Sequence, residues 1–177
     1  MRQGSSSESA TERFVADGML GKIALWLRLT GHDCYYAPDM SDDDLLTLAA
    51  EENRVLLTSD EELDTRAISQ GLKSMLVRGD VDAEVASVFR EFHIRPEVNP
   101  SVARCSKCNG RLTEVQRDEK SRLKGLVYES TLEHYDKFWL CESCNSVYFQ
   151  GGHWKNITAY MERIQEMMGD TRSSPDA

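Results

Sequence analysis

Acidic side chains recur where apolar segments of this 177-residue chain end. Asp17 ends the segment RFVAD, Asp42 opens the stretch after a second apolar run, and Asp60 follows a third. If these runs are strands of an open parallel sheet, their carboxyl ends form one edge, where such sheets bind ligands. The catalytic candidates that follow from this placement are Asp17, Asp42, Asp43, Asp60 and Glu62.

Clustered carboxylates repel one another unless a cation joins them. Mg²⁺ and Mn²⁺ suit all-oxygen sites and keep several of their waters. Such an ion orients a water, lowers its pKa and stabilises the leaving oxygen of a phosphodiester, without a Ser, Cys or His nucleophile. We expect Asp17, Asp42 and Asp60 to hold the ion, although acids at such positions also cap helices and favour the helix dipole.

Four of the five cysteines form two C-x2-C pairs, Cys105 with Cys108 and Cys141 with Cys144. Two thiolates from each turn would complete a tetrahedral zinc site, and four thiolates leave no open position for catalysis. The pairs lie further apart than those of common zinc ribbons, so a hairpin or an insertion must fill the gap. Cys34, in an apolar segment, is interpreted as a buried small hydrophobic residue.

The segments that must position these groups alternate between strands and helices. Apolar residues at i, i+3, i+4 and i+7 from Leu20 predict a first helix that Gly31 ends, and Ser41 is placed to cap a second. This alternation predicts a parallel sheet with helices on its faces. The expected strands are 13–17, 34–37, 54–59 and 73–78, with later helices at about 61–70 and 82–92.

The chain divides at a proline-marked segment, 94–101, which indicates a linker. Ahead of it we expect a β/α domain, and beyond it a zinc module and an amphipathic helix whose apolar stripe packs on the rest of the fold. The expected units are a flexible tail at 1–12, the β/α domain at 13–98, the ribbon at 99–152, the helix at 153–168 and a flexible tail at 169–177.

Composition limits the classes of function. With 40% hydrophobic residues the chain can bury a core, and its net charge of −9 argues against a basic groove for nucleic acid without disfavouring a metal-dependent enzyme. No apolar stretch approaches the ~20 residues that span a bilayer, and the N-terminus lacks the apolar core of a signal peptide. We therefore expect a cytoplasmic protein without a membrane partner.

Two basic stretches are candidates for contacts with phosphates. The segment QRDEKSRLKG, between the cysteine pairs, is the densest cationic stretch, and a second group lies on the first helix. A solvated loop and a solvated helix face are the simpler interpretations of the two. The candidate RNA contacts are Lys22, Arg28, Arg117, Lys120, Arg122 and Lys124.

Several motifs, taken in order, resemble one known family. They are DGMLGKIALWLR (17–28) with Gly31 and Asp33, SDDDLL, LLTSDEEL, RCSKCNG (104–110) and FWLCESCNSVYFQGGHW (138–154). The family is the PIN-like RNase domain first named for the C-terminus of the Mut-seven exonuclease, and the similarity runs over roughly residues 13 to 165. It implies a PIN-like three-layer α/β/α sandwich with a parallel sheet, then a small C-terminal zinc ribbon and a terminal helix, and metal-dependent cleavage of RNA.

The resemblance also assigns roles to positions. Asp17 matches the acid after the first strand. Asp42 matches the acid at the S-D-[DE]-[DE]-[LI] helix start, with Asp43 as a near competitor. Asp60 and Glu62 match the segment T-x-D-x-[DE]-[LF].

These features predict an endoribonuclease with Mg²⁺ or Mn²⁺ for catalysis and zinc for structure. Its expected partner is RNA, such as ribosomal RNA or tRNA, or the ribosome. The alternative is a non-catalytic RNA- or ribosome-binding adaptor, in which the acids would lie apart or pair with arginines. A toxin of a toxin–antitoxin pair is disfavoured by the fused ribbon. Ser59 stands where we expect an arginine in many relatives, so one phosphate contact is expected to be missing.

Overall fold

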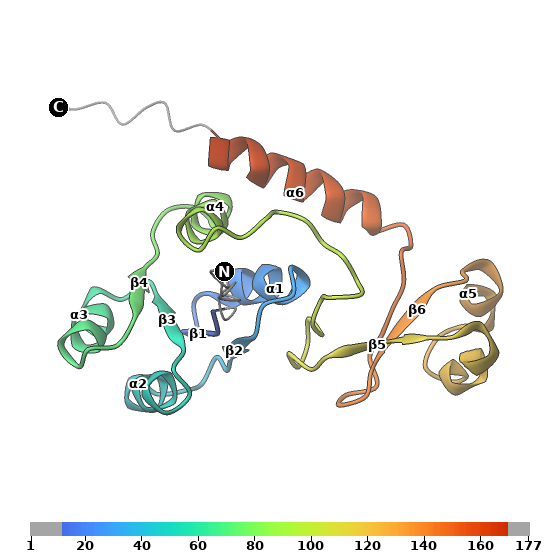
Figure 1. The fold of residues 1–177 in the computed structure, drawn as a ribbon, viewed down its shortest axis with the longest axis horizontal. Coiled ribbons are helices and arrows are strands. Elements are labelled where there is room, and N and C mark those ends of the chain that lie inside the picture. The colour runs from blue at the N-terminus through green and yellow to red at the C-terminus, as the bar shows by residue number, and fades with distance from the viewer. Residues whose placement is uncertain (1–11, 170–177) are drawn as a thin grey trace, which may run out of the picture.

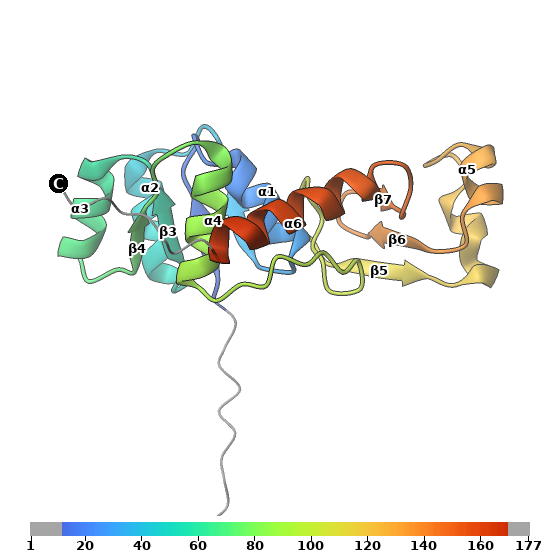
Figure 2. The ribbon, with the colours of Figure 1, turned by 90° about the horizontal axis from the view of Figure 1, so that it is seen from above.

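The structure, a computed structural model, describes residues 12–169. The tails expected over 1–12 and 169–177 lie outside this range, apart from Glu12 and Gly169. The molecule is elongated, with a β/α part at one end, a small antiparallel sheet at the other and the last helix running between them (Figures 1 and 2).

Four short parallel strands form the main sheet in the order β2-β1-β3-β4. The central pair aligns Phe14 with Val55 and Ala16 with Leu57. Both central strands are buried throughout, the pattern of a parallel sheet covered on both faces. The strands are β1 (Phe14–Ala16), β2 (Cys34–Tyr36), β3 (Val55–Thr58) and β4 (Ser74–Leu76).

Alternate residues of the central strands face two separate cores. Phe14 and Ala16 pack with α1 and α4, whereas Val15 packs with α2 and α3 on the opposite face. The expected three-layer α/β/α sandwich is therefore confirmed. The four helices are α1 (Gly21–Leu29), α2 (Asp42–Glu51), α3 (Glu61–Ser69) and α4 (Val81–Glu91).

Side chains at the helix starts shape the carboxyl edge of the sheet. Ser41 Oγ accepts a hydrogen bond from Asp44 N at 3.2 Å at the start of α2, and Asp60 and Asp80 cap α3 and α4 in the same way. Such caps satisfy backbone N–H groups that have no partner within the helix. The loops that end at these caps carry the acidic side chains to one end of the sheet.

The second part of the chain is an antiparallel sheet in the order β5-β6-β7. Between β5 (Leu112–Val115) and β6 (Phe138–Cys141) lie a 3-10 helix, η1 (Arg117–Leu123), and α5 (Glu129–His134), and β7 (Val147–Tyr148) completes the sheet. The two inserted helices fill the long gap between the cysteine pairs and form the far end of the molecule (Figure 2). They share a small core with Phe138 and Leu140 of β6.

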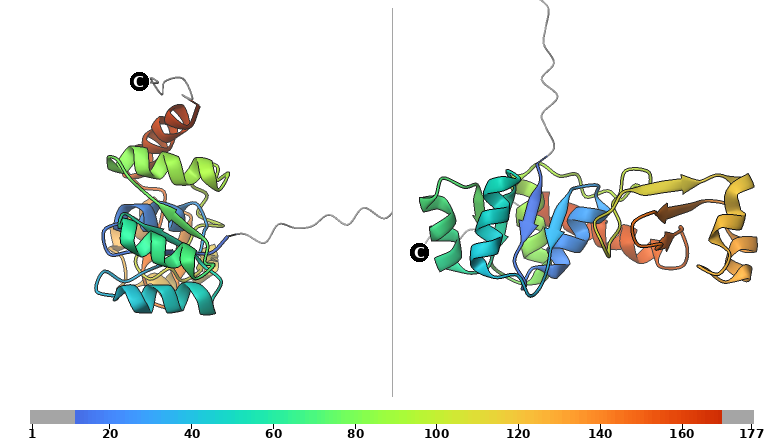
Figure 3. Two further views of the ribbon diagram at one scale, coloured as in Figure 1. Left: turned by 90° about the vertical axis from the view of Figure 1, so that its left-hand side faces the viewer. Right: turned by 90° about the horizontal axis from the view of Figure 1, so that it is seen from below.

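The last helix, α6 (Trp154–Gly169), returns from the ribbon and packs against α4 (Figure 1). Figure 3 shows it outside α4, on the side away from the sheet. Met161 and Ile164 of its predicted stripe are buried in the core shared with α1 and α4, and Tyr160 stacks on Trp26 with ring centroids 4.1 Å apart. In the described range, no helix combines the length and hydropathy that crossing a bilayer requires.

Candidate functional site

A cleft of about 450 Å³ opens at the carboxyl ends of β1 and β3. Asp17, Asp42 and Asp60, the three acids expected to hold a metal ion, all contribute to its lining. They come from the ends of β1 and β3 and from the start of α2, so the parallel topology brings together side chains that are far apart in the sequence.

Asp17 is the most tightly held of these acids, with 7% of its surface exposed. Its Oδ1 accepts a hydrogen bond from Met19 N at 2.9 Å. Its Oδ2 accepts two more, from Thr58 Oγ1 at 2.5 Å and from Ser59 N at 3.0 Å. The carboxylate is thus oriented by donors from the loop after β1 and from the end of β3 before any ligand binds, as a preorganised site requires.

Asp60 is exposed and caps α3, since its Oδ1 accepts hydrogen bonds from Glu62 N at 2.7 Å and Leu63 N at 3.1 Å. Among the described residues no donor reaches its Oδ2, which leaves that oxygen to a ligand. Glu62 is also exposed but is not among the residues that line the cleft. The structure therefore brings Asp60, and not Glu62, to Asp17.

Asp42 and Asp43 occupy different surfaces, although both pair with Arg66 of α3. Arg66 Nη1 lies 3.5 Å from Asp42 Oδ2, and Nη2 is in contact with Asp43 Oδ1. Asp42 lines the cleft, whereas Asp43 lines a separate hollow between α2 and the end of α3. Arg66 was not singled out in the sequence, because nothing local in the α3 segment indicates a partner on α2.

The three acids line the same cleft, but their carboxylate oxygens do not all lie within 4.8 Å of one another. Within residues 12–169, the four cysteines are the only group of three or more potential ligand side chains whose atoms all lie within 4.8 Å of one another. An all-oxygen set of this kind fits Mg²⁺ or Mn²⁺, which bind through one or two carboxylates and retain waters for the rest.

Two further acids lie at the start of the fourth helix: Asp80, the N-cap of α4, and Glu84 in its first turn. Burial raises the pKa of Glu84, and the negative charges of Asp17 and Asp80 raise it further. The Glu84 carboxyl, on the helix that follows β4, therefore lies close enough to Asp17 for the two charges to interact. The segment GDVDAE could have been found by the same rule that selected Asp17 and Asp60, because it follows the fourth strand.

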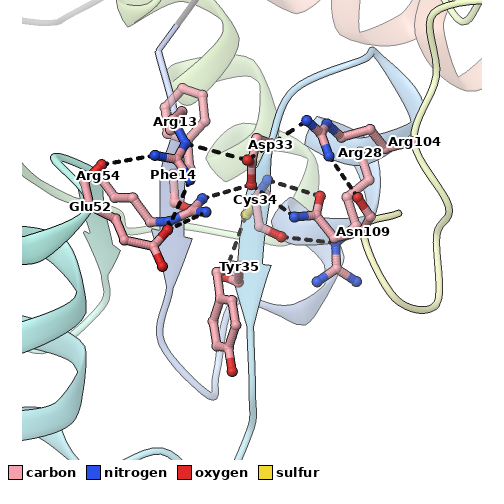
Figure 4. Close-up of polar contacts among 10 residues, drawn as sticks. All are labelled: Arg13, Phe14, Arg28, Asp33, Cys34, Tyr35, Glu52, Arg54, Arg104 and Asn109. Atoms are coloured by element: carbon pink, nitrogen blue, oxygen red, sulfur yellow. Dashed lines mark hydrogen bonds and ion pairs between the residues drawn. The ribbon is translucent and has the colours of Figure 1, made fainter. Parts of the chain in front are cut away.

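Arg28 was expected to contact RNA, but its side chain is buried, with only 5% of its surface exposed. Its Nε donates to Cys34 O at 2.9 Å (Figure 4). Its Nη1 donates to Ser106 O at 3.0 Å, so the guanidinium joins α1 to β2 and to the first cysteine turn. This geometry favours a structural role over the expected RNA contact.

The basic residues between the cysteine pairs divide into two groups. Lys120 Nζ donates to Leu132 O at 3.1 Å and Tyr135 O at 2.6 Å, so it holds the inserted helices together. Arg122 forms ion pairs with Glu119 and Glu142. Three candidate RNA contacts remain: Lys22 on α1, and Arg117 and Lys124 between the cysteine pairs. All three are exposed, and among the described residues none of them forms an ion pair.

The four cysteine sulfurs form a second site. Cys105 Sγ lies 3.5 Å from Cys144 Sγ, and Cys108 Sγ lies 3.4 Å from Cys141 Sγ. A tetrahedral Zn²⁺ with bonds of about 2.3 Å places its sulfurs about 3.8 Å apart, so the four cysteines fit zinc with little movement. A Cβ at Gly110 would lie 2.9 Å from Cys141 Sγ, which explains the glycine after the first turn.

The first cysteine turn is also joined to the β/α part through Asp33 (Figure 4). Asp33 Oδ1 accepts from Arg54 Nη1 at 2.7 Å and from Asn109 Nδ2 at 2.8 Å. Asn109 Oδ1 in turn accepts from Cys34 N at 3.1 Å, at the start of β2. Cys34 itself is buried, and burial raises the pKa of its thiol to about 12, so it is an unreactive core residue.

A comparison with known protein families identifies the family of this chain. The sequence model of the Mut7-C RNAse domain matches residues 12–161, most of the chain. The chain belongs to the Mut7-C RNAse domain family. No curated protein and no solved structure gives a significant match. Membership confirms the resemblance seen in the motifs, and the RNase family indicates a nuclease-like function with RNA as the substrate.

Proposed function

We propose that the protein is an endoribonuclease that hydrolyses RNA phosphodiesters with Mg²⁺ or Mn²⁺ held by Asp17, Asp42 and Asp60. The observation that carries the proposal is the shared cleft, in which acids from β1, α2 and the end of β3 meet at the carboxyl edge. The RNase family to which the chain belongs supports the same chemistry.

A bound ion would supply Lewis-acid activation of a water and would neutralise phosphate charge. The chain supplies the placement. Asp17 is held by Met19 N, Thr58 and Ser59, so it defines where the ion sits. Asp60 offers its Oδ2, while its Oδ1 stays occupied by the helix cap. Asp42 reaches the cleft from the start of α2.

The zinc centre would be structural in this proposal, because four thiolates leave no open position on the ion. RNA would approach the cleft past Lys22 and extend toward Arg117 and Lys124 on the ribbon. These three are the candidate RNA contacts that are exposed and form no ion pair among the described residues. Structured cellular RNAs, such as ribosomal RNA or tRNA, are long enough to contact both parts.

One observation favours a second candidate, an RNA- or ribosome-binding adaptor without catalysis. Arg66 pairs with both Asp42 and Asp43, and the acids of the cleft do not gather within 4.8 Å. An adaptor tolerates such pairing, whereas a nuclease must release Asp42 to the ion when substrate binds. The two candidates therefore differ in what the acids do in the presence of metal.

The test is cleavage of labelled single-stranded and structured RNAs with Mn²⁺, with Mg²⁺ and with EDTA. We expect cleavage only with the metals, and a loss of at least about 100-fold in Asp17→Asn and Asp60→Asn. Asp60→Asn is the cleaner variant because asparagine also caps helices and so preserves the start of α3.

Two neighbouring variants sharpen the assignment. Asp42→Asn should lose activity and Asp43→Asn should keep it, because only Asp42 lines the cleft although both pair with Arg66. Asp44→Asn, at an exposed acid of the same helix start, is the matched control. Absence of cleavage by folded, zinc-loaded protein would favour the adaptor, and cleavage unaffected by Asp17→Asn and Asp60→Asn would refute this site.

A further inference from the structure

The cleft that holds the acids also has an apolar rim. Met19, 83% exposed, lies at its mouth, and Pro38 and Met40 contribute to its lining. The floor includes the buried side chains of Leu45 and Leu63. A large exposed apolar side chain two residues after the central acid contrasts with its neighbour Leu20, which is buried in the core.

The rim is held in position relative to Asp17. Tyr36 Oη donates to Gly18 O at 3.1 Å, which ties the loop after β1 to the end of β2. A Cβ at Gly18 would lie 2.6 Å from Pro38 O, so the two loops approach each other too closely for any other residue there. Because Met19 N donates to Asp17 Oδ1, the loop that presents Met19 also orients the acid.

A nucleotide matches this combination of surfaces. It carries a charged phosphate and, a few ångströms away, a flat base with an apolar face. The flexible, polarisable thioether of methionine packs well against aromatic rings. In a duplex the base faces are covered by stacking, so only an unpaired nucleotide can offer one to a protein. A volume of about 450 Å³ lies within the range of small-ligand pockets.

We propose that Met19, Pro38 and Met40 form a subsite for an unpaired nucleobase beside the scissile phosphate. The subsite rests on the proposed nuclease function for its neighbouring phosphate. Met19 is then a specificity-determining residue. Its side chain contacts the base, and its backbone N–H orients the acid that holds the ion.

A binding measurement tests this subsite independently of catalysis. The experiment measures fluorescence anisotropy of a labelled single-stranded RNA decamer and of the same strand in a duplex, with Ca²⁺ in place of Mg²⁺. We expect tighter binding of the single strand, and a loss of about tenfold in Met19→Ser, the size of a weak base-stacking contact. Duplex binding should be unchanged by the substitution.

Two further variants and one altered RNA control the test. Ile68→Ser, at an apolar side chain that is 59% exposed on α3 and outside the cleft lining, should bind like wild type. Met19→Phe should restore binding, since an aromatic ring also stacks on a base. With an abasic residue at the site, wild type should bind no more tightly than Met19→Ser.

The outcomes distinguish this proposal from the nuclease itself. Single-strand selectivity that depends on Met19, without cleavage under any metal, would support the subsite and refute the nuclease. If the protein cleaves RNA with metal, but wild type and Met19→Ser bind the single strand with equal affinity, the nuclease proposal is supported and the subsite proposal is refuted. Equal affinity for the single strand and the duplex would also overturn it.

Discussion

At the scale of single residues, Asp33 shows how one carboxylate can serve two parts of the chain. Burial opposes its ionisation, but hydrogen bonds from Arg54 and Asn109 and the charges of Arg54 and Arg104 outweigh that effect and lower its pKa to about 2. Its Oδ1 accepts from Arg54 and Asn109, and its Oδ2 faces Arg13 and Arg104. Each oxygen thus already faces donors.

Asp33→Asn is therefore predicted to destabilise the fold by about 2–3 kcal/mol at neutral pH. Whichever way the amide is turned, its N–H groups point at donors, and Arg54, only 6% exposed, loses one of its two charged partners and keeps only Glu52. Urea unfolding would measure the loss, and Asp39→Asn, at an exposed aspartate of the next loop, is the control with little expected change. Equal stability of wild type and Asp33→Asn would contradict the role of this carboxylate.

The stability difference between wild type and Asp33→Asn should depend on pH, because folding lowers the pKa of Asp33. A carboxyl whose pKa falls on folding adds stability that is fully present above its unfolded value near 3.8 and is lost as the pH falls toward 2. For a partly exposed group, solvent screening leaves about 1–2 kcal/mol of this contribution. The difference in the free energy of unfolding between wild type and Asp33→Asn should therefore decrease between pH 4 and pH 2.

The limits of sequence reasoning are also clearest at single residues. Asp17 and Asp60 could be placed at the cleft because position after a strand is a local property. Arg28 could not be placed correctly, since its acceptor Ser106 lies 78 residues away in the chain. The pairing of Arg66 with Asp42 depends on how α2 and α3 pack, which the spacing of residues within either helix does not encode.

At the scale of elements, the β/α half could be predicted nearly completely, because buried strands and one-sided helices leave clear periodic patterns. Strands are shorter than expected; the first runs over Phe14–Ala16 rather than 13–17. The inserted η1 and α5 were expected only as an unspecified hairpin or insertion, since η1 is highly charged and α5 buries no residue fully. Helix α6 was foreseen, but its partner α4 was not.

The docking of α6 gives a prediction at this scale. Ile164 is fully buried in the core shared with α1 and α4, so Ile164→Ala should destabilise the protein by about 2–4 kcal/mol through lost burial and a cavity. Glu166→Ala, on the exposed side of the same helix, should change stability by less than about 0.5 kcal/mol. Thermal and urea unfolding measure both variants, and similar values for the two would show that α6 is not held by this face.

At the scale of the whole molecule, hydrogen bonds join the first cysteine turn to the β/α part. Arg28 donates to Ser106 O and Lys107 O, both within the first cysteine turn. Arg104 N donates to Arg28 O at 2.8 Å, and Asn109 accepts from Cys34 N. A metal ion held by the four cysteines would fix the conformation of this turn, so zinc binding and the stability of the sheet edge should be energetically coupled.

Removal of zinc is therefore predicted to loosen β2 as well as the ribbon. Hydrogen exchange followed by mass spectrometry would measure protein treated with a thiolate-zinc chelator under reducing conditions. The segment 31–36 should exchange faster, because Cys34 N loses its acceptor Asn109 when the turn opens. The strand β3, in the centre of the sheet and distant from the turn, should keep its protection and provides the internal control.

Substitution of one ligand offers a second route to the same state. Cys108→Ser removes an exposed sulfur and should reproduce the exchange pattern of the chelated protein, whereas Lys107→Ala in the same turn should leave it unchanged. Unchanged exchange at 31–36 after complete zinc loss would mean that the sheet edge does not depend on the ribbon. Faster exchange would mean that the metal centre helps to hold the strand beside β1, whose end carries Asp17, and so supports the cleft from a distance.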